Sequence, residues 1–286
     1  MLMPDRRPER HAVRPIITLT SDFGLSDHYV AAMKAVLVRQ CPQARLIDVT
    51  HTVRRHDILC ASITLERAVD GFPPETVHLA VVDPGVGTDR RLIIARVRQQ
   101  YIVCPDNGLI TWAWQVHGGE WVRQITWHPR QSSTTFHGRD VMAPIAGRIA
   151  AGDDLTDFSR PIDDPILLED LAPASAAQSR GRVIHIDHFG NATTNIRQDA
   201  LKKLPAANVK INRRVIGKLK RTYWDVAPGK PLALIGSSGL LEIAVRDGSA
   251  EDDLKVRVGD EVVLRESAGR GERTERTERG ERGGDR

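Results

Sequence analysis

The chain has 286 residues, 41% of them hydrophobic, which is long enough for one large domain and a smaller one. Its 41 basic and 37 acidic residues are interspersed along the body of the chain, so the formal net charge of +4 does not indicate a nucleic-acid partner. No apolar run approaches the roughly 18 residues of a membrane span, and no apolar signal core follows the charged start, so we expect a soluble, cytoplasmic protein without membrane contact.

Both ends of the chain lack the apolar residues that a folded core needs. Residues 1–14 are rich in Arg and Pro, and residues 267–286 repeat Gly, Glu, Arg and Thr. Segments of this composition cannot bury enough surface to offset the cost of ordering them. We therefore predict two disordered tails, and a basic tail that contacts RNA is the less favoured alternative.

Between the tails, the first half of the chain alternates strand and helix signals. The expected strands, which are short and mostly apolar, are Ile16–Leu19, Leu46–Val49, Val77–Val82, Leu92–Val97 and Tyr101–Cys104. The expected helices, which carry apolar residues at helical spacing, are one after a cap at Ser26-Asp27, then Asp57–Val69, Gly108–Val116 and Val141–Ala151. This rhythm predicts a three-layer α/β/α domain over residues 15–171.

After Pro173 the pattern changes to short β runs separated by Gly, Asn and Pro. The segment Ala174–Gly181 is small and polar, and we interpret it as a linker. The expected strands are Arg182–Asp187, Val209–Ile211, Val215–Lys220, Pro231–Ile235, Leu241–Val245, Leu254–Val258 and Glu261–Leu264. They predict a smaller all-β, barrel-like domain over residues 178–266, and a boundary between domains is a common place for a ligand.

The stretch from Asp83 to Arg90 is the first candidate for a functional site. Asp83 ends the buried run Val77–Val82 and is followed by Pro84 and two glycines, as in the loops that bind ligands in open α/β sheets. The glycines allow a tight turn, so Arg90 can return its positive charge toward Asp83. The alternative is an ordinary turn with an ion pair on the surface.

Three further polar residues lie in loops beside expected strand ends. Asp22 offers two acceptor oxygens that suit the two hydroxyls of a ribose, although it can also be a turn or helix-cap residue. Asp27 can face an ammonium group, or it can interact with the dipole of the following helix. Asn107 follows another expected strand, in an Asp-Asn-Gly sequence that is also an ordinary turn signal.

His137 lies in the polar stretch Thr135–Asp140, which precedes an expected helix. Backbone donors at the start of a helix disfavour an added proton, so we expect a neutral imidazole that can hydrogen-bond to water. A surface or structural histidine is the alternative. If His137, Asp83 and Arg90 converge, they can together hold and polarise one water molecule.

Two loops of the second domain also carry candidate binding residues. These residues are Asp187, Phe189 and Asn191 in the first loop, and Ser237, Ser238 and Glu242 in the second. The first set can recognise a purine by stacking and by hydrogen bonds to the base edge, although a β-turn with one buried aromatic residue looks the same. The hydroxyls and backbone amides of the second loop can take a carboxylate, although hairpin connections often look similar.

In this order, six of these stretches resemble the S-adenosylmethionine hydroxide adenosyltransferases, which are relatives of the fluorinase and the chlorinase. The likeness extends over nearly all of residues 15–266, and six motifs in register make it specific. The stretches are Thr20–Gly24, Val82–Gly87 with Arg90, Pro105–Gly108, Phe136–Asp140, Asp187–Asn191 and Ser237–Gly239.

The resemblance implies hydrolysis of S-adenosylmethionine to adenosine and L-methionine, with water or hydroxide attacking the 5′-carbon. It assigns Asp83, Arg90 and His137 to the water, Asp22 to the ribose hydroxyls and Asp27 to the methionine ammonium. The other binding residues that it implies are Asn107, Asp187, Phe189, Asn191, Ser237, Ser238 and Glu242. It implies no metal or cofactor, because S-adenosylmethionine is the substrate, and it implies a homotrimer with active sites between subunits.

Two departures from the family pattern concern substrate binding. The fluorinase has a Trp in the loop after the second strand, where this chain has the segment His51–Asp57. The turn at Asp187 is one residue shorter than in the fluorinase. The contact that replaces the Trp therefore stays open, and so does the role of Asp187.

Three other functions also stay open. The halogenating relatives lack the acid and the histidine at these places, so a halogenase is less favoured than a hydrolase. A metal-dependent hydrolase would use hard ligands near strand ends, although no recognised ligand spacing supports it. The ligands available to it are Asp22, Asp27, His28, His51 and Asp83. A non-catalytic sensor would use the same pocket only to bind S-adenosylmethionine or a nucleoside.

Overall fold

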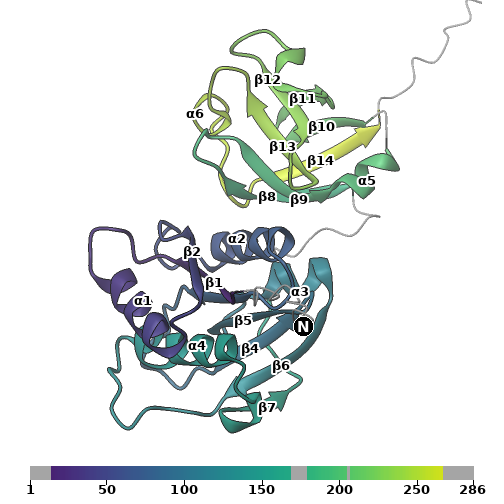
Figure 1. The fold of residues 1–286 in the computed structure, drawn as a ribbon. Coiled ribbons are helices and arrows are strands. Elements are labelled where there is room, and N and C mark those ends of the chain that lie inside the picture. The colour runs from purple at the N-terminus through teal and green to yellow at the C-terminus, as the bar shows by residue number, and fades with distance from the viewer. Residues whose placement is uncertain (1–13, 169–178, 205–206, 267–286) are drawn as a thin grey trace, which may run out of the picture.

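The computed structural model describes residues 14–168, 179–204 and 207–266. Figure 1 shows a larger N-terminal part, which ends at residue 168, and a smaller C-terminal part, which begins at residue 179. The predicted tails lie outside the described residues except for Arg14, and the predicted linker does so except for residues 179–181.

The N-terminal part is organised around a seven-stranded mixed sheet with the strand order β2-β1-β3-β5-β4-β6-β7. The strands are β1 (Ile16–Ser21), β2 (Arg45–Thr50), β3 (Val77–Val81), β4 (Leu92–Val97), β5 (Gln100–Pro105), β6 (Gly119–Ile125) and β7 (Ser159–Ile162). β1, β2, β3 and β5 are parallel, whereas β4, β6 and β7 form antiparallel pairs at one side. Asp22 and Asp83 follow the neighbouring parallel strands β1 and β3, so both leave the sheet at its carboxyl edge.

Helices cover both faces of this sheet, as Figure 1 shows. They are α1 (Tyr29–Gln40), α2 (Ile58–Gly71), α3 (Thr111–His117) and α4 (Ala143–Ala151). One core cluster joins apolar residues of α1 and α4 to the sheet, and another joins residues of α2 and α3 to it. On β3, Leu79 belongs to the first cluster and Ala80 to the second, because successive side chains of a strand point to opposite faces. The predicted three-layer α/β/α arrangement is confirmed.

The C-terminal part is a seven-stranded antiparallel sheet with the strand order β11-β10-β14-β8-β9-β13-β12. Its strands are β8 (Arg180–Ile186), β9 (Ala192–Arg197), β10 (Ala207–Ile211), β11 (Arg214–Lys218), β12 (Pro231–Ile235), β13 (Leu240–Val245) and β14 (Glu261–Glu266). Two short helices, α5 (Gln198–Lys202) and α6 (Ala250–Asp253), connect them. The edge strands β11 and β12 contact each other, and the Lys220 N–H donates to the Ala233 carbonyl, so the sheet is nearly closed. The predicted barrel-like class is confirmed.

The predicted strand Leu254–Val258 is wrong. The residues before it form α6, where the Ser249 hydroxyl caps the helix by accepting from the Asp252 N–H at 3.0 Å. Lys255 then has φ 58°, a left-handed conformation that does not continue into a strand. Val256 is nevertheless buried in the core. The apolar character of this segment therefore reflects burial and not a β-strand.

The sequence patterns do not reveal β6, β7 or β9, and β9 shows why. Its residues Thr193, Thr194 and Asn195 are polar but buried. The Thr194 hydroxyl donates to the Leu241 carbonyl at 2.9 Å, and Asn195 Oδ1 accepts from the Arg182 N–H at 2.7 Å. Hydrogen bonds to neighbouring strands thus make a polar segment suitable for the middle of a sheet.

Two predicted helix starts also differ from the structure. α1 begins at Tyr29, and no side-chain hydrogen bond caps it at His28, so Ser26-Asp27 belongs to the preceding loop. α3 begins at Thr111 rather than at Gly108, because Gly108 has φ 97°, outside the helical region.

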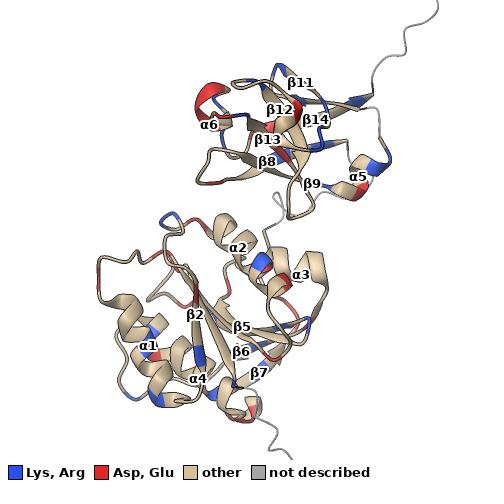
Figure 2. Ribbon diagram, turned by 45° about the horizontal axis from the view of Figure 1, so that its top comes forward, with Lys and Arg blue, Asp and Glu red and all other residues tan. Residues whose placement is uncertain are grey.

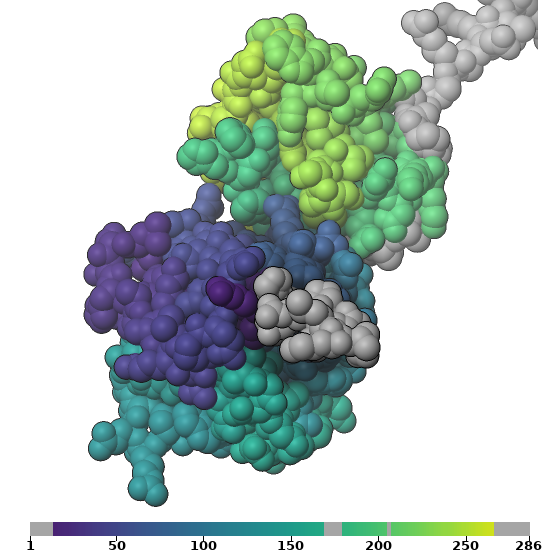
Figure 3. Space-filling model, viewed as in Figure 1, coloured from purple at the N-terminus to yellow at the C-terminus, as the bar shows by residue number. Residues whose placement is uncertain are grey.

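The C-terminal part lies over α2 of the N-terminal part (Figures 1 and 3). Across this junction, Cys60 Sγ on α2 lies 3.6 Å from His185 Nδ1 on β8. Figure 2 shows basic and acidic residues interspersed over both parts. No helix in the described ranges is both long enough and apolar enough to cross a membrane.

Candidate active site

The loop after β3 returns Arg90 to Asp83. Its first turn is closed by a hydrogen bond from the Val86 N–H to the Asp83 carbonyl at 3.2 Å. Gly87 has φ 84°, and a Cβ at this position would lie only 2.9 Å from the Thr134 carbonyl oxygen. A residue with a side chain would be strained there, so this glycine permits the tight loop that the sequence predicts.

Asp83 and Arg90 form a bidentate ion pair. Arg90 Nε donates to Asp83 Oδ1 at 2.5 Å, and Arg90 Nη2 donates to Asp83 Oδ2. The side chains of Asp83 and Arg90 are 6% and 10% exposed, so this is not the surface pair of the alternative interpretation. Two parallel hydrogen bonds between charged groups fix the orientation of both side chains.

The imidazole of His137 lies against the same guanidinium, at the start of the turn Gly138–Met142 that leads into α4. Arg90 Nη1 and Nη2 each lie 3.2 Å from His137 Nδ1. A guanidinium can only donate, so Nδ1 is the acceptor and the neutral ring carries its proton on Nε2. Burial is the largest cause that lowers the pKa of His137, the charge of Arg90 adds to it, and Asp83 opposes both. The structure thus brings the three predicted catalytic residues together.

A cavity of about 270 Å³ opens beside this cluster. Its lining residues are Asp22, Phe23, Arg55, His56, Val81, Asp83, Val86, Thr135, Phe136, His137 and Gly138. The rings of Phe23 and Phe136 pack edge to face, with their centroids 5.8 Å apart, and provide an apolar wall. The cavity therefore places a paired carboxylate and an imidazole beside an apolar wall, an arrangement that can hold and orient one water molecule.

Asp22 faces this cavity and also supports the loop after β2. Asp22 Oδ2 accepts from the His56 N–H at 2.9 Å, and Oδ1 has no hydrogen bond to a described residue. His56 has φ 63°, which is uncommon for a residue other than glycine. One oxygen of Asp22 thus holds the backbone of the neighbouring loop, while the other is left for a ligand hydroxyl.

His51 ties the loop after β1 to the loop after β2. Its carbonyl accepts from the Gly24 N–H at 2.7 Å, and its Nδ1 lies 2.8 Å from the Ser21 hydroxyl oxygen. Its Nε2 lies 3.1 Å from Asp48 Oδ1, without hydrogen-bond geometry. His51 therefore has a structural role.

The described part of the chain contains no set of ligands for the metal-dependent hydrolase that the sequence left open. No group of three or more His, Cys, Asp or Glu side chains there is arranged to hold a metal ion. Of its five possible ligands, Asp83 is paired with Arg90, and His51 holds the loops after β1 and β2.

Two predicted binding residues of the N-terminal part do not line the cavity. Asp27 is exposed on the loop before α1. Asn107 Nδ2 donates to the Val82 carbonyl at 2.9 Å, so Asn107 fixes the backbone immediately before Asp83. Asn107 Oδ1 is buried and has no hydrogen-bond partner among the described residues.

In the C-terminal part, the turn at Asp187 is closed on itself. Asp187 Oδ1 accepts from the N–H groups of Phe189 and Asn191 at 2.9 Å each, and Oδ2 accepts from Asn191 Nδ2 at 3.2 Å. The ring of Phe189 is 72% exposed, so the predicted alternative of a buried aromatic is wrong. The turn thus presents a ring to solvent while its polar groups bind one another.

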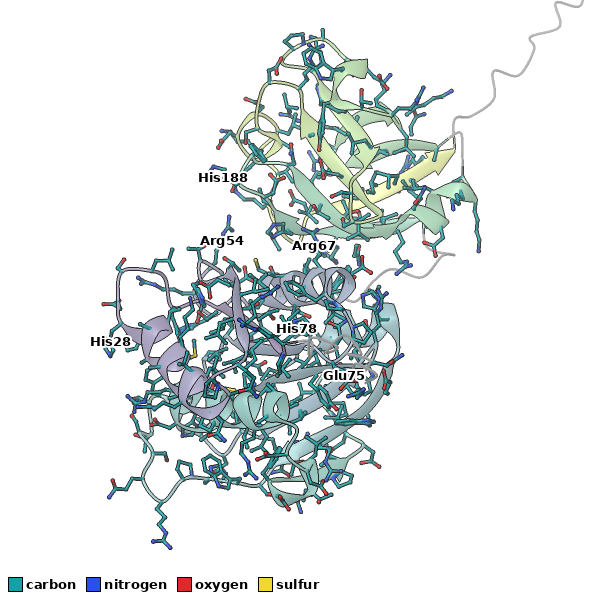
Figure 4. All side chains as sticks on the ribbon, in the orientation of Figure 1. His28, Arg54, Arg67, Glu75, His78 and His188 are labelled. Carbon is teal, nitrogen blue, oxygen red and sulfur yellow. The ribbon has the colours of Figure 1, made fainter. Side chains whose placement is uncertain are left out.

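Ser237 and Ser238 line a separate cavity of about 280 Å³, together with Glu66, Arg67 and Asp70 of α2. Figure 4 shows Arg67 at the junction between α2 and the C-terminal part. Within one chain, the structure therefore does not bring the predicted carboxylate-binding loop to the Asp83 cavity.

Glu242 on β13 is paired with a residue that the sequence patterns do not single out. The Tyr223 hydroxyl donates to Glu242 Oε1 at 2.6 Å. Burial raises the pKa of Glu242, and burial together with this hydrogen bond raises the pKa of Tyr223. Tyr223 gives no sequence signal beyond being an aromatic residue in a loop.

Arg55 and His56 also carry no motif, yet both line the Asp83 cavity. The signal that points to them is the departure from the family pattern over His51–Asp57. The structure shows that this segment forms a wall of the cavity, because its backbone is hydrogen-bonded to Asp22.

The fold and this site together define a two-part α/β protein with an Asp-Arg-His cluster at the carboxyl edge of its sheet. A family model for the SAM (S-adenosylmethionine) hydroxide adenosyltransferase N-terminal domain matches residues 17–159, and one for the C-terminal domain matches residues 181–263. The chain belongs to the SAM hydroxide adenosyltransferase family.

Relatives with known names cover most of this chain. It is 39% identical over 267 residues to the (R)-S-adenosyl-L-methionine hydrolase of Salinispora tropica, a match that covers 90% of this chain and 100% of the relative. It is 27% identical to the fluorinase of Nocardia brasiliensis over 291 residues, covering 88% of this chain and 97% of the relative. An uncharacterized conserved protein from Thermotoga maritima has a similar crystal structure, with a TM-score of 0.80, 37% identity, and coverage of 87% of this chain and 100% of the other.

Proposed function

We propose that this protein is an enzyme that hydrolyses S-adenosyl-L-methionine to adenosine and L-methionine. The observation that carries the proposal is the cluster of Asp83, Arg90 and His137 at a cavity that Asp22 also lines. The relatives named (R)-S-adenosyl-L-methionine hydrolase, at 32–39% identity, support the same activity, and the named fluorinases are more distant.

The reaction needs little help at its leaving group. The oxygen of water forms a bond to the 5′-carbon as the bond from that carbon to sulfur breaks, and sulfur takes the electron pair. The positively charged sulfonium becomes a neutral thioether, so no acid has to protonate methionine. The enzyme has to position one water molecule opposite sulfur and remove a proton from it.

The hydrogen bonds of the cluster divide these tasks between its members. His137 Nδ1 accepts from Arg90, so the ring presents its Nε2–H, which can orient a water molecule by donating to its oxygen. Each Asp83 oxygen retains acceptor capacity beyond its bond to Arg90, so Asp83 is the base that takes the proton of the water. Arg90 stabilises the negative charge that develops on the attacking oxygen.

Asp22 is the substrate-binding residue that this cavity supports best, because its Oδ1 is left for the ribose hydroxyls. Asp27, Asn107 and the residues of the C-terminal part do not line the cavity of their own chain. We propose that a homotrimer forms the complete site, in which the loops of one subunit's C-terminal part approach the Asp83 cavity of the next. These loops contain Asp187, Phe189, Asn191, Ser237, Ser238 and Glu242.

The proposal includes a cytoplasmic location and excludes nucleic acid and membrane as partners. It also includes no metal and no organic cofactor, because the bond changes balance with water alone. Turnover that persists in a strong chelator would agree with this part of the proposal, and turnover that stops and returns with added metal would contradict it.

The decisive experiment is product analysis after the full chain is incubated with S-adenosylmethionine in water enriched in oxygen-18, with and without excess chloride or fluoride. We expect adenosine that carries the label, together with methionine, in every buffer. A 5′-halogenated nucleoside would make the protein a halogenase. Saturable binding without any product, unchanged in Asp83→Asn, would make it a sensor of S-adenosylmethionine or a nucleoside.

A further inference from the structure

The wall of the Asp83 cavity contains a positive charge that the water-activating cluster does not use. Arg55 lines the cavity from the loop between β2 and α2. Within the described ranges, its guanidinium makes no hydrogen bond and no ion pair. An arginine that stands at a cavity without a protein partner is available to a ligand.

Arg55 is the one arginine or lysine among the described residues that line the cavity. Both hydrogen bonds of Arg90 to Asp83 compensate its charge, and the lowered pKa of His137 favours the uncharged imidazole. Asp22 and Asp83, in contrast, add negative charge to the lining. Arg55, whose guanidinium has no partner among the described residues, is thus placed to attract an anionic group of a ligand.

The backbone around Arg55 is held in place. The next residue, His56, has φ 63° and donates its N–H to Asp22 Oδ2 at 2.9 Å. The Asp57 N–H donates to the Arg54 carbonyl at 3.0 Å, and the Asp57 carboxylate caps α2 by accepting from the Cys60 N–H at 2.9 Å. A left-handed residue with a side chain costs free energy and persists where the surroundings fix it. The backbone on both sides of Arg55 is therefore held in place relative to Asp22.

The substrate of the proposed function carries two positive groups, the sulfonium and the ammonium, and one negative group, the methionine carboxylate. We propose that Arg55 binds this carboxylate and so selects a substrate with an intact amino acid. The assignment rests on the proposed function. It differs from the carboxylate site expected at Ser237 and Ser238, which in the same chain line a separate cavity with Glu66, Arg67 and Asp70.

The experiment compares S-adenosylmethionine with its analogue that lacks the carboxyl group, in the full-length wild type, Arg55→Gln, Arg55→Lys and Arg54→Gln. Arg54 is the matched control, because it is the neighbouring arginine but does not line the cavity, and Figure 4 shows it directed toward the C-terminal part. Thermal unfolding of each variant tests that it folds like the wild type.

We expect Arg55→Gln to raise KM for S-adenosylmethionine on the order of 10-fold, as for loss of a charged hydrogen bond, with kcat nearly unchanged. KM for the decarboxylated analogue should change less than about 3-fold, Arg55→Lys should recover part of the loss, and Arg54→Gln should match the wild type. As a readout that needs no turnover, L-methionine should bind Arg55→Gln more weakly in calorimetry, whereas adenosine should bind equally well.

An equal loss for both substrates, or weaker binding of adenosine, would overturn the assignment by placing Arg55 at the nucleoside. The same loss in Arg54→Gln would overturn it as a general charge effect. If wild-type protein converts neither substrate, the proposed function fails instead, and the calorimetric comparison of L-methionine still decides whether Arg55 binds a carboxylate.

Discussion

The Asp83 loop and the Asp187 turn both place an aspartate after a strand, but they use the carboxylate differently. Asp83 binds a side chain, Arg90, which in turn contacts His137 at the edge of a cavity. Asp187 accepts from the backbone and side chain of its own turn. Asp83 therefore lines a cavity while its charged partner holds it in place, whereas the carboxylate of Asp187 serves the structure of its own turn.

The largest effect that would test this difference is expected for Asp83→Asn. The substitution keeps the shape of the side chain but removes the base and leaves the charge of Arg90 uncompensated. We expect kcat for adenosine formation to fall about 10³- to 10⁴-fold with KM changed only several-fold. The thermal unfolding temperature controls for a folding defect.

Asp187→Asn makes the matched change in the turn, and we expect it to affect KM rather than kcat. Asp22→Asn should likewise raise KM first, because Asp22 faces the ribose in the proposal. If all three variants lose kcat equally, the distinction between the two carboxylates is wrong.

The second prediction concerns the neutral imidazole. The ordinary pKa of histidine is 6.5, and burial together with Arg90 lowers the pKa of His137. As pH falls below 6.5 and through this lowered pKa, the ring gains a proton on Nδ1 and can no longer accept from Arg90. We expect kcat/KM to fall over that range in the wild type. His137→Gln should be about 10²-fold slower at pH 7 and should lack this acidic limb.

The pH–rate profiles of both proteins, measured with enzyme that stays folded across the range, provide the check. An acidic limb that persists unchanged in His137→Gln would assign the titration to another group. A variant with nearly full activity at pH 7 would remove His137 from the orientation of water.

The third prediction concerns the stability of the sheet beneath the cavity and not the reaction in the cavity. His78 on β3 lies in the core, with Nδ1 2.7 Å from the Thr18 hydroxyl and Nε2 2.7 Å from Gln100 Oε1 (Figure 4). Burial lowers the pKa of His78 to about 4. The unfolded chain therefore takes up this proton first as pH falls from about 6.5, and the folded state loses stability until about pH 4, by about 3 kcal/mol in all.

Denaturant unfolding of the wild type at pH 7 and at pH 4.5 measures this loss, and His78→Gln is the comparison because it keeps polar groups at the site without a titrating ring. The variant should be less stable at pH 7 but should lose less on acidification. An equal loss in both proteins would assign the acid sensitivity to other groups.

The smallest effect is expected for Phe189, the exposed aromatic residue of the Asp187 turn. Phe189 is 72% exposed, so Phe189→Ala should change the free energy of unfolding by no more than about 0.5 kcal/mol. If the ring contacts substrate in the cavity of a neighbouring subunit, KM for S-adenosylmethionine should still rise about 3- to 10-fold. Sedimentation measures whether wild type and variant are trimers, and an unchanged KM in a trimeric variant would remove Phe189 from the site.

Much of the fold follows from the sequence because its burial pattern is simple. The run Val77–Val82 is apolar except for His78, and both faces of β3 are indeed covered by helices. The secondary-structure prediction fails where buried residues are polar or where apolar residues lie outside strands and helices. The buried Thr and Asn side chains of β9 depend on partners in strands β8 and β13, and Lys255 adopts a left-handed conformation that periodicity does not encode.

The cluster of Asp83, Arg90 and His137 was predictable because short motifs carry each residue and the sheet brings their loops to one edge. Arg55 and His56 were not, because the residue that positions them, Asp22, is distant in sequence and binds a backbone group. The meeting of Ser237 and Ser238 with α2 depends on how the two parts pack, which local patterns do not contain.

The polar centre of β9 also limits how the C-terminal sheet can misalign. A slip of one residue would turn Thr194 and Asn195 away from the carbonyl of Leu241 and the N–H of Arg182, and would bury these groups unpaired. At about 2 kcal/mol for each of two such groups, the slipped arrangement would be populated roughly a thousandfold less than the native one. An apolar strand in the same place would pack as well but would favour the native register less strongly. The hydroxyl of Thr194 and the amide of Asn195 therefore help to select the correct register of β9 when the sheet folds.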